Sequence, residues 1–271
     1  MPPIQPHKTI ALLFHEQDSP ATIHNYLITY YARIWQQLGF KVFALFGTHQ
    51  FIPADLILVH VDLSVVPEAY CTFAARYPVV LNGRVRDIRK SAISQQLLKP
   101  GDNYSGKVIV KSDCNYAALP EQRLHCQSAT TFFSSPLDYH VFPNIHAVPD
   151  QLWQEPSLVV EQFLPELIGG LYHVRFYNFL GSKGNCMRIA STHPIVHISH
   201  AVTIEQIPLD PRLDELRQAH HFDYGKFDYV ERDGEIILFD TNKTTGFVGG
   251  STDPKWQQAR YERALGILDY L

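Results

Sequence analysis

Three oxygen-bearing side chains lie on a predicted β-hairpin near the end of the chain. Residues 226–229 and 236–242 are rich in β-forming types and flank an Asp-Gly turn, where glycine tolerates the positive φ of a tight hairpin. Alternate residues of a strand share a face, so Asp240 and Asn242 point the same way, and Asp228 on the partner strand is within reach of that face. Two carboxylates and an amide oxygen suit a hard cation such as Mg²⁺ or Mn²⁺. The alternative is a solvated hairpin with ordinary surface aspartates.

Basic residues precede this hairpin in an order that suits a nucleotide triphosphate. Lys90 falls in a predicted helix, and Lys111 ends the apolar run 108–110. A lysine on the rigid end of a buried strand is a positioned cation for phosphate oxygens. The alternative for Lys111 is a structural lysine whose ammonium reaches solvent past the end of its strand.

A third predicted strand, residues 158–161, leads into Gln162, Phe163 and Leu164. The chain that follows such a strand can present backbone N–H and C=O groups to the edge of an adenine, while an aromatic ring and aliphatic side chains sandwich the base. Residues 161–164 are therefore the predicted adenine site.

The first third of the chain alternates strands and helices. Residues 9–15 form a continuous apolar run typical of a strand buried on both faces, and further strands are predicted at 41–46, 56–60 and 78–82. Helices are predicted at 21–38, where Gly39 ends the pattern, and at 67–77. This alternation predicts a small doubly wound domain. Ligands of such domains bind beyond the carboxyl ends of the strands. The candidate substrate residues at these ends are Glu16, His60 and Asp62. The alternative for each is an ordinary polar residue of a loop.

The pattern changes after residue 98. Residues 87–98 read as a helix that Pro100-Gly101 breaks, and a strand-rich region follows up to a terminal helix at 254–271. We therefore predict an α/β (α+β) protein with two domains, residues 1–98 and residues 99–271, the second with mainly antiparallel sheets.

Composition excludes several partners. The formal net charge of −4 and the lack of a basic face argue against nucleic acid, and no apolar run is long enough to span a bilayer. The polar, Pro-rich start lacks the apolar core of a signal peptide. The four cysteines form no CxxC pair, which argues against zinc and against a disulfide scaffold. Reduced cysteines predict a cytoplasmic location, and a homodimer is the expectation from general frequency.

Five stretches together resemble the ATP-grasp superfamily, which includes D-alanine–D-alanine ligase and glutathione synthetase. They are residues 87–90, 108–111, 158–166, 226–229 and 238–246, in family order, and the last is close to the family's Glu-x-Asn-x-x-Pro-Gly. The resemblance covers the chain from about residue 85 to the end. The preceding βαβ region looks like the small domain that comes before the grasp domain in these ligases.

This resemblance implies roles for particular residues. Lys90 and Lys111 would contact phosphates, and Glu161, Gln162, Phe163 and Leu164 would line the adenine, with Glu166 at the ribose. Asp228, Asp240 and Asn242 would hold one or two Mg²⁺. Lys226 takes the place of a basic residue that meets phosphate. Arg175 would contact phosphate or the acceptor carboxylate, or would instead be an arginine paired with a surface acid.

The implied activity is an ATP- and Mg²⁺-dependent ligase that joins a small-molecule or peptide carboxylate to an amine or thiol through an acyl phosphate. The loops 112–120 and 243–251 are candidate lids or acceptor walls. The loop after Lys111 lacks the glycines that most relatives use to approach phosphates closely. Two alternatives stay open: a non-catalytic nucleotide-binding protein, which the glycine-free loop favours, and a small-molecule kinase on the same fold.

Overall fold

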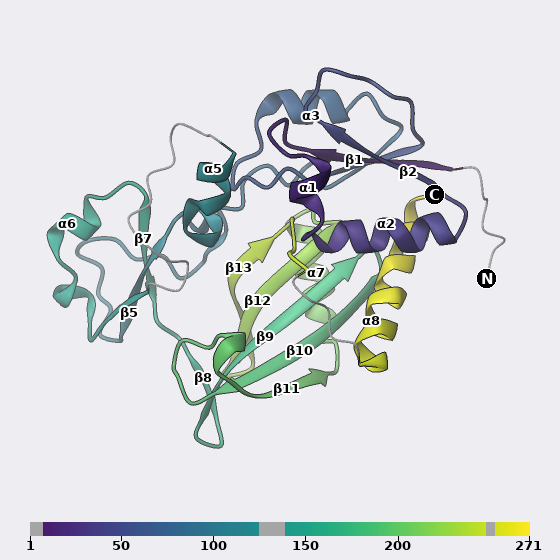
Figure 1. Ribbon diagram of the computed structural model, residues 1–271. Coiled ribbons are helices and arrows are strands. Elements are labelled where there is room, and N and C mark those ends of the chain that lie inside the picture. The colour runs from purple at the N-terminus through teal and green to yellow at the C-terminus, as the bar shows by residue number, and fades with distance from the viewer. Residues whose placement is uncertain (1–7, 125–138, 248–252) are drawn as a thin grey trace.

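The structure is a computed structural model that describes residues 8–124, 139–247 and 253–271 (Figure 1). A parallel sheet of order β2-β1-β3-β4 comes first. Alternation along β1 sends Ile10, Leu12 and Phe14 into one core cluster and Ala11 and Leu13 into another. The strand is thus buried on both faces, which confirms the predicted doubly wound arrangement. Its elements are β1 (Thr9–Phe14), β2 (Lys41–Phe46), β3 (Leu56–Val59), β4 (Val79–Leu81), α2 (Leu27–Gln37) and α3 (Glu68–Ala74).

The helix predicted over residues 21–38 is wrong at one point, because the structure divides it into α1 (Pro20–Ile23) and α2. Tyr26 between them is extended, and it forms an isolated β-bridge with Gly246. The N–H of Leu27 donates to the Thr245 carbonyl at 2.9 Å. A distant segment, the chain that follows the predicted metal hairpin, therefore supplies the pairing that interrupts the helix.

A small antiparallel sheet of order β6-β5-β7 follows. The helix predicted over 87–98 is wrong beyond Ile93, where α4 (Lys90–Ile93) ends. The next residues run beside β7 instead, and the N–H of Leu98 donates to the Val160 carbonyl at 2.8 Å. The elements of this part are β5 (Val108–Ser112), β6 (His140–Phe142), β7 (Leu158–Gln162), α5 (Leu119–Arg123), α6 (Asp150–Trp153) and the 3₁₀ turns η1 (Asn115–Ala118) and η2 (Ile145–Ala147).

The largest sheet has six strands, and all of its pairings are antiparallel, as predicted. Its order is β11-β10-β9-β12-β13, and β8 also pairs with β9. A cluster of buried aromatic residues joins one face of this sheet to α7. The elements are β8 (Glu166–Ile168), β9 (Leu171–Leu180), β10 (Lys183–Ser191), the 3₁₀ turn η3 (Ile198–His200), β11 (Ala201–Ile207), α7 (Pro211–Ala219), β12 (Tyr224–Arg232) and β13 (Glu235–Asn242).

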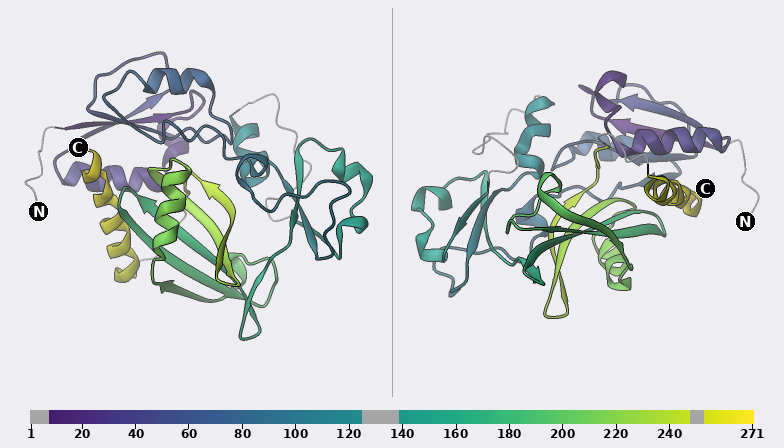
Figure 2. Two further views of the ribbon diagram at one scale, coloured as in Figure 1. Left: turned by 180° about the vertical axis from the view of Figure 1, so that it is seen from behind. Right: turned by 60° about the horizontal axis from the view of Figure 1, so that its bottom comes forward.

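The chain end returns to the N-terminal sheet. Helix α8 (Pro254–Ala264) and the 3₁₀ turn η4 (Leu265–Tyr270) lie beside α2 (Figure 2), and the indole of Trp35 donates to the Ala264 carbonyl at 2.7 Å. Asn82 adds a second link, since its side chain accepts from the N–H groups of Asp223 and Tyr224. One hydrophobic core cluster thus contains residues from both sides of residue 98. The domain boundary at that residue stays a prediction. Among the described residues, no helix is long and apolar enough to cross a membrane.

Candidate nucleotide and metal site

The hairpin of β12 and β13 brings the predicted metal residues onto one face. Asp228 lies directly opposite Asp240 in the strand register, and Lys226 lies opposite Asn242. The register shifts by one residue after Asp228, which leaves Phe239 as an extra residue on β13. A bulge of this kind re-aims side chains, and Phe239 and Asp240 accordingly both line the same cavity.

The two carboxylates lie opposite each other, and each has a lysine ammonium nearby. Oδ1 of Asp228 and Oδ1 of Asp240 are shielded from solvent and accept no hydrogen bond from the described residues. The Lys226 ammonium lies 2.8 Å from the first, and the Lys90 ammonium lies 3.7 Å from the second. Burial raises the pKa of the Asp228 carboxyl, and Asp240 adds to this rise, although Lys226 and Lys90 oppose it. A divalent cation between these oxygens would relieve both the burial cost and the like-charge repulsion.

The donor set matches a particular class of metal. Within the described ranges no group of three or more His, Cys, Asp or Glu side chains is arranged to hold an ion. The candidate site consists of Asp228, Asp240 and the amide oxygen of Asn242, which line one cavity. Mg²⁺ fits such a set, because it is bound by one or two carboxylates and completes its octahedron with waters and substrate phosphates.

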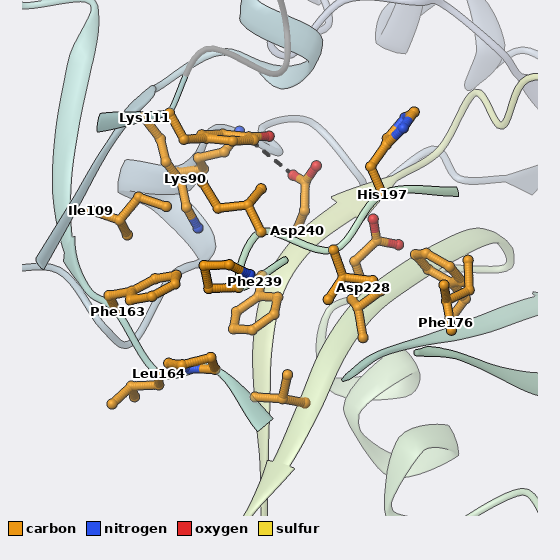
Figure 3. A pocket seen from close by; sticks show the side chains of 18 of the residues that line it. Lys90, Ile109, Lys111, Phe163, Leu164, Phe176, His197, Asp228, Phe239 and Asp240 are labelled. Atoms are coloured by element: carbon orange, nitrogen blue, oxygen red, sulfur yellow. Dashed lines mark ion pairs between the residues drawn. The ribbon is translucent and has the colours of Figure 1, made fainter. Parts of the chain in front are cut away.

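These residues open into a cavity of about 470 Å³ between the small sheet and the large sheet (Figure 3). Ile109 and Lys111 alternate toward it from β5, while Val108 and Val110 point into the core on the other side. The cavity is lined by these residues predicted as ligand contacts: Lys90, Lys111, Gln162, Phe163, Leu164, Lys226, Asp228, Asp240 and Asn242.

At one end of the cavity, Phe163, Leu164 and Phe239 form an apolar wall. The N–H of Phe163 donates to the Lys107 carbonyl at 2.8 Å, so this residue offers its ring and not its amide to a ligand. Lys90, Asp228 and Asp240 line the same cavity. An apolar wall beside cations and a metal-binding set has the polarity of a nucleoside triphosphate.

Lys111 and Glu161 bind each other. The Lys111 ammonium lies 2.6 Å from Glu161 Oε2, and the Glu161 side chain is only 2% exposed. Glu161 is absent from the residues that line the cavity. Glu161 thus lies behind the residues that line the cavity and binds the Lys111 ammonium from there. Lys111 itself faces the cavity, and its ammonium lies 5.3 Å from the centre of the Phe239 ring.

The glycine-free loop after Lys111 adopts backbone angles that glycine usually takes. Tyr116, Ala117 and Ala118 have φ of 48°, 54° and 60°. Left-handed angles cost a residue with a side chain about 1–2 kcal/mol. Tyr116 and Ala117 line the cavity. The loop therefore turns beside the cavity in a backbone conformation that costs these three residues conformational energy and would cost glycine none.

The structure does not bring Arg175 and Glu166 to the cavity. The Arg175 guanidinium forms a two-pronged pair with the Glu166 carboxylate, at 2.6 and 3.0 Å, and it also contacts Glu231. Neither residue lines the cavity. Arg175 alternates onto the face of the sheet opposite to Phe176, which lines the cavity. Of the two roles considered for Arg175, its position matches pairing with acids, and the position of Glu166 offers no contact to a ribose.

The candidate substrate residues also need correction. His60 is fully buried among the rings of Phe14, Tyr26 and Tyr224, so it belongs to the core and cannot meet a substrate. Burial lowers its pKa to about 3. Glu16 is exposed and pairs with His49 at 3.2 Å. Asp62 lies near the site, but both of its oxygens are already engaged by neighbouring side chains.

Several cavity residues escaped the sequence analysis. Tyr139, Phe176 and the loop 194–198 line the cavity, and burial together with Asp240 raises the pKa of the Tyr139 hydroxyl. Phe176 faces Asp228 across the β9–β12 pairing. The pairing of β9 with β12 joins segments about fifty residues apart, and no local pattern signals it. Part of the candidate lid 243–251, residues 248–251, lies outside the described residues.

Comparison with known proteins supports the fold. No family model matches the sequence, and no curated protein matches it. Among solved structures, D-alanine–D-alanine ligase from Bacillus anthracis complexed with ATP is similar with a TM-score of 0.51 and 13% identity, over 97% of this chain and 95% of that one. Macrocyclase MdnC bound with precursor peptide MdnA, from Microcystis aeruginosa, has a TM-score of 0.52 and 13% identity, over 96% and 99%. A RimK domain ATP-grasp protein from Sphaerobacter thermophilus has 0.51 and 10%, over 96% and 98%.

Identities this low define the fold and no more. Since these similar structures span nearly the whole chain, the protein has the ATP-grasp fold. The expected resemblance is confirmed at that level, and so is the expected combination of a parallel sheet with antiparallel ones.

Proposed function

We propose that this protein is an ATP- and Mg²⁺-dependent ligase that joins a carboxylate to an amine or a thiol. The observation that carries the proposal is the cavity between the two antiparallel sheets, which brings Asp228, Asp240 and Asn242 together with Lys90 and Lys111. The similar ligase from Bacillus anthracis is complexed with ATP, and the macrocyclase is bound with a precursor peptide. The first supports a nucleotide in this cavity, and the second supports a peptide as one class of substrate.

The reaction needs no side-chain nucleophile. The substrate carboxylate attacks the γ-phosphorus of ATP, the bond to the β-phosphate oxygen breaks, and ADP leaves. An amine or thiol then attacks the acyl carbon and loses its proton, and inorganic phosphate leaves. A bound Mg²⁺ on Asp228, Asp240 and Asn242 would neutralise charge on the transferring phosphoryl group.

The remaining residues act by position and charge. Lys90 and Lys111 bind phosphate oxygens. Lys226 is held between Asp228 and the ring of Phe176, whose centre is 4.7 Å from its ammonium. A cation fixed in this way stabilises charge that develops at the acyl phosphate without having to reorganise. The apolar wall of Phe163 and Phe239 receives the adenine ring.

A second candidate is a nucleotide-binding protein without turnover, and the backbone strain of Tyr116, Ala117 and Ala118 favours it, because that loop meets the phosphates in a form unlike a glycine-rich loop. A small-molecule kinase is the third. The three differ in what they require: a ligase releases ADP in quantity only with both a carboxylate and a nucleophile, a kinase needs one acceptor, and a binding protein releases none.

The test is ADP release from ATP and Mg²⁺ with panels of amino acids and short peptides, added singly and in pairs. We expect release with particular pairs, and loss of release in Asp240→Asn, which keeps the shape of the side chain. Asp233→Asn is the matched control, because Asp233 lies at the exposed turn of the same hairpin. Release with a single acceptor would identify a kinase, and none with any pair would contradict the proposal. A soluble cytoplasmic protein and a homodimer stay predictions.

A further inference from the structure

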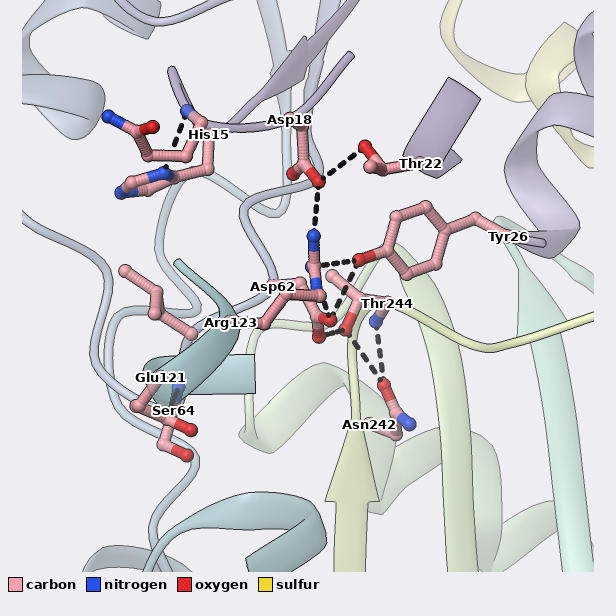
Figure 4. Close-up of polar contacts among 12 residues, drawn as sticks. His15, Asp18, Thr22, Tyr26, Asp62, Ser64, Glu121, Arg123, Asn242 and Thr244 are labelled. Atoms are coloured by element: carbon pink, nitrogen blue, oxygen red, sulfur yellow. Dashed lines mark hydrogen bonds and ion pairs between the residues drawn. The ribbon is translucent and has the colours of Figure 1, made fainter. Parts of the chain in front are cut away.

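Asp62 was a candidate substrate residue, but its contacts assign it another task. Its Oδ2 accepts from the Tyr26 hydroxyl at 2.7 Å and lies 3.3 Å from the Arg123 guanidinium (Figure 4). Its Oδ1 accepts from the Thr244 hydroxyl at 2.5 Å. With both oxygens engaged, a substrate group would have to displace one of these partners.

Thr244 also contacts Asn242, one of the three residues of the candidate metal site. Its N–H donates to Asn242 Oδ1 at 2.7 Å, and its hydroxyl lies 3.2 Å from the same oxygen. Oδ1 is the atom of Asn242 that would coordinate a cation, and it keeps a further lone pair for that purpose. The position of this oxygen therefore depends on Thr244, and the hydroxyl of Thr244 depends on Asp62.

A buried lysine fixes the same two segments. Lys243 is 1% exposed, and its ammonium donates to the Leu63 carbonyl. Residues 243 and 244 thus contact residues 63 and 62, so the end of β13 is joined to the loop after β3 by two adjacent interactions. A lysine is almost never fully buried unless its charge has a partner. The buried Lys243, directly after Asn242, therefore fixes the end of β13 against the loop after β3.

We infer that Asp62, through Thr244, is a positioning residue that orients Asn242 Oδ1 for the metal, and that Lys243 holds the two segments in register. The inference rests on the proposed metal–nucleotide site. Groups that orient metal ligands in this indirect way affect metal affinity by about 10–100-fold. Asp62 then links the N-terminal sheet to the reaction centre without touching substrate.

The test uses Asp62→Asn and Thr244→Val, which preserve shape and remove the Thr244–Asp62 hydrogen bond or weaken it. Thr245→Val is the matched control, because Thr245 is also buried but its hydroxyl forms no hydrogen bond with Asp62 or Asn242. ATP binding is measured by calorimetry over a series of Mg²⁺ concentrations and in EDTA. We expect the Mg²⁺ concentration for half-maximal tightening to rise about tenfold in both variants, and metal-free ATP binding and Thr245→Val to match wild type.

Two further measurements make the outcome specific. The double variant Asp62→Asn/Thr244→Val should be no weaker than Thr244→Val alone, because the two residues act in series. Lys243→Met should shift the Mg²⁺ dependence in the same direction. The inference would be overturned if Asp62→Asn and Thr244→Val kept the Mg²⁺ dependence of wild type. It would also be overturned if they weakened ATP binding in EDTA as much as in Mg²⁺. Failure of the proposed function would look different, since wild type itself would then show no effect of Mg²⁺.

Discussion

The Lys111 ammonium and the Glu161 carboxylate form an ion pair at the edge of the cavity, with their nearest atoms 2.6 Å apart and the side chains 11% and 2% exposed. Removing one member of such a pair leaves the other buried without compensation, which costs about 3–5 kcal/mol. We expect Lys111→Met to lower the free energy of unfolding by about that amount and Lys111→Met/Glu161→Leu to recover a large part of it. Urea unfolding of the three proteins checks this. A double variant as unstable as the single one would contradict the pairing.

Because the loop after Lys111 has left-handed backbone angles, glycine should be more stabilising than alanine there, the reverse of their order in a helix. Tyr116 has a φ of 48° and is 62% exposed, so its replacement loses little packing. We expect Tyr116→Gly to be more stable than Tyr116→Ala by about 1 kcal/mol, because only alanine pays for the left-handed angle. Ala32→Gly, in the interior of α2, is the control and should lose about 1 kcal/mol. Thermal unfolding measures both differences, and the same sign at both positions would contradict the loop geometry.

His60 predicts a dependence of stability on pH. Burial lowers its pKa to about 3, from about 6.5 in the unfolded chain. Between these values the unfolded chain binds a proton that the native protein does not, so His60 reduces stability as the pH falls through this window. The expected slope is about 1.4 kcal/mol per pH unit below pH 6. His60→Phe should remove this slope from urea unfolding curves at pH 7, 6 and 5, and an unchanged slope would count against the burial of this ring.

Arg175 tests whether a paired arginine takes part in catalysis. Its guanidinium is held by Glu166 on the side of the sheet away from the cavity. Arg175→Lys keeps the charge but loses the two-pronged geometry. We expect a loss of about 1–2 kcal/mol in the free energy of unfolding, with ATP affinity unchanged. Normal stability with abolished ADP release would return Arg175 to the catalytic role that the resemblance implied.

Local patterns in the sequence predicted the elements that depend on local chemistry. The apolar run of β1 and the alternation of β12 and β13 are each set by neighbours in the chain. The facing of Asp228 and Asp240 depends in addition on the bulge at Phe239, because the register set at the turn alone would place Asp228 opposite Phe239. The errors come from contacts between distant segments. Gly246 pairs with Tyr26 and breaks a helix, and Tyr224 helps to enclose His60.

The same distinction separates the site residues. Asp62 follows a strand, as a ligand-binding residue would, but its partner Thr244 is 182 positions away. Arg175 and Glu166 are close in sequence, yet only the pairing of β8 with β9 brings them together on the far face. A sequence pattern predicts that a polar residue lies near a strand end, and it does not predict which partner the residue finds there.

We propose that the β12–β13 hairpin holds a metal–nucleotide complex. Calorimetric titration of ATP with and without Mg²⁺, on wild type, on Asp240→Ala/Asn242→Ala and on the hairpin-turn control Asp233→Ala, tests it most directly. We predict tight binding that depends on Mg²⁺ in wild type and in the control, and loss of that dependence in the double variant. Absence of ATP binding in every condition, or a double variant that keeps the Mg²⁺ dependence, would contradict it.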